Sequence, residues 1–482
     1  MAMFQNKICL YNLENRGTGF IASVTPKRSN NLIMSDRGLL LKNINEDWLL
    51  ALDPENVFWG VLPKTPNGEF ILPESLIEMY NQNRDELDKQ MSDFRFGIDL
   101  NCIYIDPTDR CNADCPYCYI PPAIRKGGVQ MTYEQLDAIL QKITVYFEAK
   151  KKKPVIVFHA AEPLLVKDIL FKAIEKYHQS LLFGIQTNAL LLEQSDVEFM
   201  KKYRVGVGIS LDSSVRDINN ISRASGNNGV GGGGNFQSAI KAIDWFDGYA
   251  GLNVICTVSK HNAHKLSELV QFLHSKHISC VLLNPVRTTR NQALKIKATD
   301  KEFYHGLVSA VEKAMELTVE TGQQIIIGNF ANIILSIVSP MARRMMCDIS
   351  PCGGGRTFIT IAANGDILPC GEFTGFRSEF SGGNIFDTSI DDALNSEPFH
   401  KVRSRKVERI SECKDCGLRN ICGSPCPAEM HGRGDIYQKA EFCEFYKEII
   451  MYAFKLIAQN KLGLLLRKDS LEQMEFEYKL PD

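Results

Sequence analysis

Residues 102–118 read CIYIDPTDRCNADCPYC, a short β-rich run followed at once by three cysteines. The cysteines have the spacing Cys-x3-Cys-x2-Cys, at Cys111, Cys115 and Cys118. Three thiolates on one tight loop can hold three corners of a cubane iron–sulfur cluster and leave the fourth iron open to a substrate or cofactor. Zinc is the alternative, but structural zinc sites normally close with four ligands, and no fourth Cys or His lies nearby in the sequence.

The run from Cys102 to Asp106 is the first of six β-rich runs that alternate with helical patterns up to about Gly322. The other five are Val155 to His159, Leu182 to Gln186, Val205 to Leu211, Val254 to Val258 and Cys280 to Leu283. The stretch Tyr133 to Phe147 has helical spacing, and Thr132 with Gln135 forms a capping box before it. Six such units predict parallel strands, hence an α/β barrel or an open sheet with its chemistry at the carboxyl ends of the strands.

The flanking segments have different patterns. Before residue 99 there are short β-like runs at Ile8 to Leu13 and Gly19 to Val24, then a helical stretch from Glu74 to Met91, which predict a small α+β domain. After about residue 340 cysteines become dense, and Asn364-Gly365 between two β-like runs, Thr357 to Ala362 and Asp366 to Leu368, predicts a hairpin. An amphipathic helix docked on the protein is predicted from Tyr446 to about Lys468.

Composition limits the class of protein. The 482 residues include 55 Lys+Arg and 57 Asp+Glu and are 44% hydrophobic, which fits roughly three domains and gives no net basic field for nucleic acid. Neither a secretory signal nor an uninterrupted apolar stretch of about 18 residues is present, so we expect a cytoplasmic protein without a membrane span. Fifteen cysteines are too few for a disulfide scaffold, and their clustering in a cytosolic protein indicates metal.

The three-cysteine motif, with Tyr117 before its last cysteine, resembles that of the radical S-adenosylmethionine (radical SAM) enzymes. The resemblance implies that Cys111, Cys115 and Cys118 ligate a 4Fe-4S cluster whose open iron binds SAM. It also implies an enzyme that reductively cleaves SAM to a 5′-deoxyadenosyl radical, which abstracts hydrogen from an unactivated C–H bond. The six strand–helix units match the partial (β/α)6 barrel of that family.

The resemblance extends to four candidate SAM contacts. The segment His159-Ala-Ala-Glu162-Pro stands where the family usually has Gly-Gly-Glu-Pro, and it implies that Glu162 accepts a hydrogen bond from the SAM amino group. Asn188 matches a Thr-Asn-Gly segment, while Ser210 and Arg223 match the contacts to the SAM carboxylate. For Ser210 and Arg223 the alternative is ordinary helix capping or a surface ion pair.

Eight further cysteines resemble the pattern of the SPASM domain that many peptide-modifying radical SAM enzymes carry. The family pattern assigns one auxiliary 4Fe-4S cluster to Cys347, Cys352, Cys370 and Cys426, and another to Cys413, Cys416, Cys422 and Cys443. Zinc ribbons are the alternative. The implied cofactors are three 4Fe-4S clusters and SAM, and the implied domains are 1–98, 99–335, 340–450 and 451–482.

SPASM-bearing enzymes modify polypeptides, so the implied partners are a precursor peptide and an external low-potential electron donor such as flavodoxin or ferredoxin. We favour a maturase of ribosomally made peptides that forms thioether or carbon–carbon crosslinks. An anaerobic sulfatase-maturating enzyme, which makes formylglycine, would carry an Asp general base directly after Cys370, where this chain has Gly371. A non-catalytic iron–sulfur or zinc scaffold is a third hypothesis. The resemblance also suggests leader-peptide recognition by residues 1–98, through addition of a strand to a sheet edge.

Overall fold

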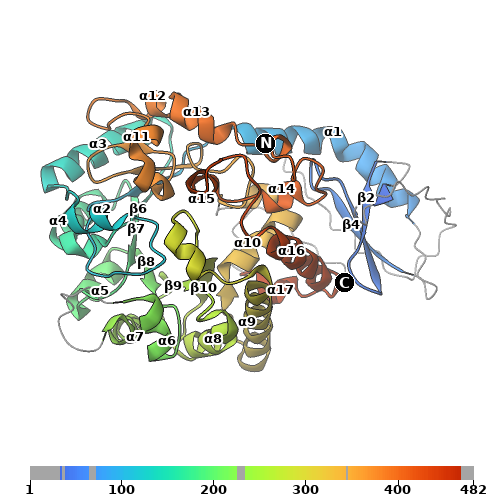
Figure 1. The fold of residues 1–482 in the computed structure, drawn as a ribbon, viewed down its shortest axis with the longest axis horizontal. Helices are drawn as coiled ribbons and strands as arrows, with labels where there is room; N and C mark the ends of the chain where they lie inside the picture. The colour runs from blue at the N-terminus through green and yellow to red at the C-terminus, as the bar shows by residue number, and fades with distance from the viewer. Residues whose placement is uncertain (1–32, 35–37, 65–71, 225–233, 344–345, 468–482) are drawn as a thin grey trace.

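The computed structural model describes residues 33–34, 38–64, 72–224, 234–343 and 346–467. Within them, nine strands form one sheet in the order β11-β10-β9-β8-β7-β6-β5-β12-β13 (Figure 1). The strands are β5 (Cys102–Ile105), β6 (Val155–Phe158), β7 (Leu182–Thr187), β8 (Gly206–Ser210), β9 (Leu252–Val258), β10 (Cys280–Pro285), β11 (Ile326–Ile327), β12 (Phe358–Ile361) and β13 (Ile367–Leu368).

The six predicted strands are β5 to β10, and all of them run parallel to their neighbours, as the alternating pattern predicted. Burial alternates along β9, where Val254 and Cys256 are fully buried while Ile255 and Thr257 on the other face are partly exposed. The short strand β11, which extends the sheet beyond β10, was not predicted. The α/β fold with a parallel sheet is confirmed.

The helices between these strands lie outside the sheet (Figure 1). They are α2 (Pro122–Gly127), α3 (Tyr133–Ala149), α4 (Lys167–Tyr177), α5 (Gln194–Lys202), α6 (Arg216–Ser222), α7 (Gly234–Phe246), α8 (Leu266–Ser275), α9 (Asp300–Thr321) and α10 (Gly328–Val338). The capping box predicted for α3 is present, because Gln135 N donates to Thr132 Oγ1 at 3.2 Å and Thr132 N donates to Gln135 Oε1 at 2.9 Å. This box fixes the first turn of the helix.

The hairpin predicted around Asn364-Gly365 is also present, as β12 and β13, and Gly365 has the positive φ of 90° that such a turn requires. The hairpin lies within the predicted cysteine-rich segment. The strand β12 pairs in parallel with β5, with Thr360 opposite Tyr104, and so joins the sheet of the α/β unit. The cysteine-rich segment and the three-cysteine loop therefore start from neighbouring strands.

A second sheet of four antiparallel strands lies before the α/β unit. Its strands are β1 (Ile33–Met34), β2 (Leu40–Asn43), β3 (Trp48–Leu52) and β4 (Trp59–Pro63), in that order. The predicted runs Ile8 to Leu13 and Gly19 to Val24 lie outside the described residues, and β2 to β4 were missed. Both β3 and β4 are buried on both faces, so they lack the polar alternation that identifies a strand.

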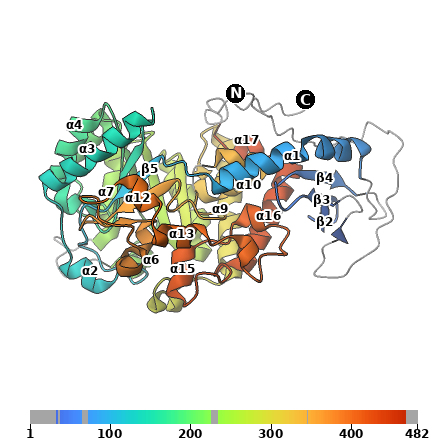
Figure 2. The same ribbon diagram turned by 90° about the horizontal axis from the view of Figure 1, so that it is seen from above.

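This sheet shares its core with the rest of the molecule. Leu50, Trp59 and Val61 belong to the main hydrophobic core, and Trp59 Nε1 donates to the Ile337 carbonyl of α10 at 2.9 Å. The predicted helix is α1 (Glu74–Phe96), which runs from the small sheet to the cysteine-rich segment (Figure 2). Removing residues 1–98 would consequently uncover the main core.

The cysteine-rich segment contains short helices. These are α11 (Arg377–Phe380), α12 (Ile390–Leu394), α13 (Glu397–Arg403), α14 (Arg419–Cys422) and α15 (Pro427–Gly432), preceded by the 3-10 helix η5 (Gly371–Phe376). The predicted C-terminal helix is divided into α16 (Cys443–Ala458) and α17 (Leu462–Leu465), with Asn460 between them at a φ of 56°. The helix α16 packs on α9, as expected for a docked helix. No helix in the described ranges is long and apolar enough to cross a membrane.

Candidate active site

The loop that carries the first three cysteines begins where β5 ends, and the buried side chain of Arg125 in α2 stabilises it. The buried Arg125 guanidinium donates from Nη1 to the Ala113 carbonyl at 3.1 Å and pairs through Nη2 with Asp114 at 2.9 Å. In return, the Arg125 carbonyl accepts from Cys111 N at 3.2 Å. The loop is therefore held in shape by the protein itself.

The three thiols lie close enough to influence one another. Burial raises the pKa of Cys111 to about 12, and the charges of Glu162, Cys115 and Cys118 contribute in the same direction. Burial likewise raises the pKa of Cys115 to about 11. Buried thiols of this kind become thiolates only where a cation compensates their charge. Three such donors on one loop fit a cluster with one open iron.

Glu162 lies just beyond β6 and is buried, with 1% exposure. Its Oε1 accepts from Thr187 Oγ1 at 2.7 Å and from Leu164 N at 3.1 Å, while its Oε2 accepts from Asn188 N at 2.8 Å. The carboxylate thus ties the end of β6 to the end of β7. A carboxylate has about four acceptor positions, so one position remains for a further donor such as an amino group.

Asn188 and Ser210 occupy the ends of the next two strands. Asn188 Nδ2 donates to Asn112 Oδ1 at 2.8 Å and lies 3.8 Å from Cys111 Sγ, so the strand end is joined to the cysteine loop. Ser210 is the last residue of β8 and is partly exposed. Both residues are therefore placed at the carboxyl edge of the sheet, and Asn188 contacts the cysteine loop.

Arg223 follows α6 and forms a buried ion pair, in contrast to the surface pair considered as an alternative. Its Nε lies 3.0 Å from Asp212 Oδ1, and the side chain of Asp212 is fully buried. Asp212 also accepts from Tyr117 Oη at 2.7 Å and from Thr257 N at 2.8 Å. The guanidinium lies near enough to Cys115 to lower the pKa of that thiol, against the larger effect of burial. A fixed positive charge therefore stands beside the cysteine loop.

Replacing Glu162 with alanine is expected to destabilise the fold, because three donors near the end of β7 and at the start of η1 lose their acceptor. Each buried donor left unpaired costs about 1–3 kcal/mol. Thermal unfolding of the full chain, followed by circular dichroism, should show a lowered Tm for Glu162→Ala and a smaller loss for Glu162→Gln, which keeps one carbonyl oxygen. The control is Glu198→Ala at an exposed position of α5. Unchanged stability with weakened SAM affinity would instead assign the carboxylate to SAM alone.

The eight remaining predicted ligands fall into two spatial sets. The first cysteine set is Cys347, Cys352, Cys370 and Cys426, and the second cysteine set is Cys413, Cys416, Cys422 and Cys443. Burial raises the pKa of Cys370, and the charges of the other three members of the first set add to the rise. The pKa of Cys422 is raised in the same way by burial and by the rest of the second set. The cysteines that the resemblance groups together therefore lie near enough to influence one another's pKa.

The cysteines of the described ranges form no disulfides. All fourteen cysteines in the described ranges are free, and there no three His, Cys, Asp or Glu side chains converge closely enough to hold one metal ion.

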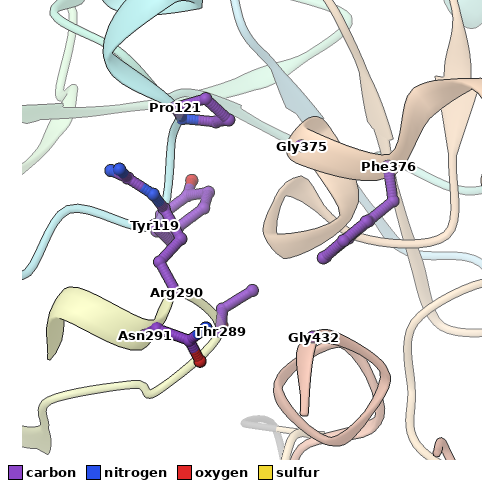
Figure 3. Close-up of a pocket in the computed structure, with 8 residues that line it drawn as sticks. All are labelled: Tyr119, Pro121, Thr289, Arg290, Asn291, Gly375, Phe376 and Gly432. Atoms are coloured by element: carbon purple, nitrogen blue, oxygen red, sulfur yellow. The ribbon is translucent and has the colours of Figure 1, made fainter. Parts of the chain in front are cut away.

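A cavity of about 290 Å³ opens between the cysteine loop and the cysteine-rich segment (Figure 3). Its lining residues are Tyr119, Pro121, Thr289, Arg290, Asn291, Gly375, Phe376 and Gly432. Figure 3 shows the loops after β5 and β10 on one side, facing η5 and α15 on the other. The sequence analysis did not identify these residues. One sequence feature could have identified two of these lining residues: Tyr119 and Arg290 each follow the carboxyl end of a predicted strand, where α/β proteins bind their ligands.

Comparison with known proteins decides the family. Residues 105–273 match the family model described as "Radical SAM superfamily". The chain belongs to the radical SAM superfamily. Residues 352–417 match the SPASM "Iron-sulfur cluster-binding domain", so this radical SAM enzyme also carries a SPASM domain. Together the two domains imply 4Fe-4S clusters and SAM as its cofactors.

Relatives of this radical SAM enzyme include both uncharacterised and named proteins. An uncharacterised protein of Archaeoglobus fulgidus is 41% identical over 89% of this chain and 97% of its own length. The subtilosin biosynthesis protein AlbA of Bacillus subtilis is 26% identical over 66% of this chain and 65% of its own length. A cysteine-type anaerobic sulfatase-maturating enzyme of Clostridium perfringens is 21% identical over 71% of this chain and 93% of its own length.

The fold is shared with solved structures. The structure titled "Native anSMEcpe with bound AdoMet and Cp18Cys peptide" superposes with a TM-score of 0.62 at 19% identity, over 75% of this chain and 99% of that one. At this identity the likeness establishes the fold, a radical SAM barrel combined with a SPASM domain.

In this radical SAM enzyme the position after Cys370 is surrounded by polar groups. A Cβ added at Gly371 would lie 3.5 Å from Tyr119 Oη, 3.7 Å from His159 Nδ1 and 3.7 Å from Thr360 Oγ1. None of these three atoms has a hydrogen-bond partner among the described residues, although all are buried. His159 Nδ1 faces the buried carboxylate of Asp106 at 3.6 Å. Uncommitted polar atoms therefore gather where the sulfatase maturases would place a carboxylate.

The next residue, Glu372, is partly exposed in the site, and desolvation raises its pKa to about 7. Its Oε2 accepts from Thr289 Oγ1 at 3.2 Å, which joins η5 to the loop after β10. From the same loop, Arg290 Nη1 donates to the Cys118 carbonyl at 3.2 Å. The loop after β10 therefore contacts both the SPASM domain and the three-cysteine loop.

Proposed function

We propose that this radical SAM enzyme modifies a ribosomally made peptide and forms a thioether or carbon–carbon crosslink. The observation that supports crosslinking most directly is Gly371, which leaves the position after Cys370 without a carboxylate. The cavity between the barrel and the SPASM domain, at the carboxyl ends of the strands, is the proposed site for the peptide.

The proposed ligands follow from the assembled residues. Cys111, Cys115 and Cys118 would hold the cluster with the open iron, and the two cysteine sets would hold the auxiliary clusters. Glu162, Asn188, Ser210 and Arg223 would orient SAM beside the first cluster. When bound, this cluster and SAM supply a 5′-deoxyadenosyl radical, given an electron from a donor such as flavodoxin or ferredoxin.

A proton must also leave the peptide during crosslinking, and the chain offers an imidazole for it. The Nδ1 of His159 faces Asp106 at 3.6 Å, and the His159 side chain is 26% exposed, so Nε2 is the nitrogen left to accept a proton from a peptide group. We assign this role to His159 in place of the missing carboxylate at position 371.

A sulfatase-maturating activity is the second candidate, supported by the relatives in that class. Chemistry separates the two functions, because a crosslink removes two hydrogens and keeps the substrate sulfur, whereas formation of formylglycine from cysteine replaces the sulfur with oxygen. Two peptides are incubated with the reconstituted enzyme and analysed by mass spectrometry. One is a small cysteine-rich peptide encoded beside the gene, and the other is a synthetic peptide bearing the modified cysteine of a sulfatase. The cysteine-rich peptide should lose two hydrogens and retain its sulfur. Sulfur loss from the synthetic peptide would favour the sulfatase reaction.

The non-catalytic scaffold is tested without a peptide. Reconstituted, reduced protein incubated anaerobically with SAM should release 5′-deoxyadenosine. Protein that holds its clusters and forms no 5′-deoxyadenosine would be a scaffold.

Recognition of a leader peptide by the N-terminal region is part of the proposal. The antiparallel sheet β1–β4 supplies strands to which an extended peptide could add. Because this sheet shares the main core, photo-crosslinking of a leader peptide to the whole chain is a better test than truncation. Labelling within residues 38–63 is expected, and labelling only elsewhere would contradict the assignment.

A further inference from the structure

The two cysteine sets are joined by a single short segment of chain. Cys422 belongs to the second set and Cys426 to the first, with only Gly423, Ser424 and Pro425 between them. Ser424 lies near the second set, since its side chain lowers the pKa of Cys413 and its backbone lowers the pKa of Cys422, in both cases against the larger effect of burial. Its hydroxyl also accepts from Ala440 N at 3.0 Å. Ser424 therefore marks the boundary between the two sets.

Arg405 holds this boundary segment from inside the protein. The residue is 3% exposed, and its Nη1 donates to the Ser424 carbonyl at 2.6 Å. Nη2 donates to the Gln438 carbonyl at 2.8 Å and to Ser424 Oγ at 3.4 Å, and Nε donates to the Ile436 carbonyl. Every one of these acceptors is neutral, and no described carboxylate lies within ion-pairing distance of the guanidinium.

A buried charge without a counter-ion is costly, so the site needs negative charge from another source. The ionisable groups near Arg405 are thiols of both sets, Cys426 and Cys352 from the first and Cys413 and Cys422 from the second. Thiolate-ligated 4Fe-4S clusters are anionic and gain a further negative charge on reduction. A fixed guanidinium between two such clusters would offset charge on both.

Two other arginines in the described residues lie near thiols of the first set only. Among the cysteines, Arg356 interacts with Cys352, and Arg287, which pairs with Glu429, interacts with Cys426 and Cys347, all of the first set. Among the groups with resolved pKa shifts in the described ranges, Arg405 is the cation whose neighbours include thiols from both sets.

We propose that Arg405 is the positioning residue that couples the two auxiliary clusters electrostatically, raising the reduction potential of both. The inference rests on the proposed ligand sets and adds a function for a residue outside them. A nearby cation stabilises the reduced state of a cluster, because reduction adds one negative charge that the cation attracts. The guanidinium keeps its positive charge in both redox states, so no proton transfer accompanies the reduction. Both auxiliary clusters thereby become better electron acceptors.

The test measures potentials without a peptide. A full-length chain with Cys111, Cys115 and Cys118 all replaced by alanine retains only the auxiliary sites, so its reduced EPR signal reports on them alone. In this background Arg405→Gln should lower the midpoint potential of both clusters, so that at a fixed potential the ratio of reduced to oxidised cluster falls about tenfold, or about 59 mV for one electron. Arg405→Lys keeps the charge and should retain most of the potential.

Arg403→Gln is the matched control. Arg403 lies two residues away and donates to the Gly355 carbonyl at 2.8 Å. Burial lowers its pKa, and no thiol contributes to that shift.

Iron analysis shows whether each variant keeps its clusters. Unchanged potentials in an iron-replete Arg405→Gln protein, or equal shifts in Arg403→Gln, would overturn the proposal. If Arg405→Gln loses its iron, the test uses Arg405→Lys instead. The cluster potentials in Arg405→Lys should stay close to those of the triple-alanine background, and a lower potential in this variant would contradict the charge argument. Absence of auxiliary clusters in the parent background would instead refute the ligand assignment.

Discussion

Replacing Cys111, Cys115 and Cys118 together with alanine is expected to abolish formation of 5′-deoxyadenosine from SAM. The protein should keep about eight of about twelve irons, because the two four-cysteine sets lie outside the three-cysteine loop and are untouched. The loss should be complete within detection, since only a cluster with an open iron can bind SAM. Anaerobic reconstitution, iron and sulfide analysis, and chromatographic detection of 5′-deoxyadenosine measure both quantities.

A suitable control for this experiment is Cys280→Ala, which removes a cysteine of β10 that belongs to neither cysteine set nor the loop. It should retain all irons and SAM cleavage. Cleavage of SAM by the triple variant would refute the role of the loop, and zinc in place of iron in protein purified without oxygen would refute the cluster assignment.

The largest effect on stability is expected for Glu429→Ala in α15. The fully buried carboxylate accepts from Thr288 N at 2.6 Å and Thr288 Oγ1 at 3.0 Å, and it pairs with Arg287 Nη1 at 3.2 Å. Removing one partner of a buried pair leaves the other charge unpaired, at a cost of about 3–5 kcal/mol. Denaturant unfolding of the full chain should show a loss of that size.

The matched control replaces an exposed carboxylate. Glu444 pairs with Lys447 at 2.9 Å on the surface of α16, so Glu444→Ala should cost less than about 1 kcal/mol. Equal losses in the two variants would show that burial of Glu429 is not what fixes the loop after β10 against the SPASM domain. Because this loop forms one wall of the cavity, peptide processing should fall in Glu429→Ala while the cysteine loop still supports SAM cleavage.

Local sequence patterns were sufficient for the parallel sheet and for the candidate ligands. The strands β5 to β10 could be predicted because each is a short apolar run next to a helix of clear period, as the capping box at Thr132 illustrates. The three-cysteine loop could be predicted because its three ligands lie close together in the sequence. By contrast, β3 and β4 escaped prediction, because a strand buried on both faces carries no alternation.

The sequence by itself therefore determined the strand–helix order, the three-cysteine loop and the residues available as ligands. Only the tertiary structure decided that β12 pairs with β5, that Tyr119 and His159 surround Gly371, and that Arg405 lies among thiols of both sets. The physical reason is that periodicity and spacing report interactions between near neighbours in the chain. Contacts between residues tens or hundreds of positions apart depend on how whole elements pack, and a local pattern carries no record of that packing.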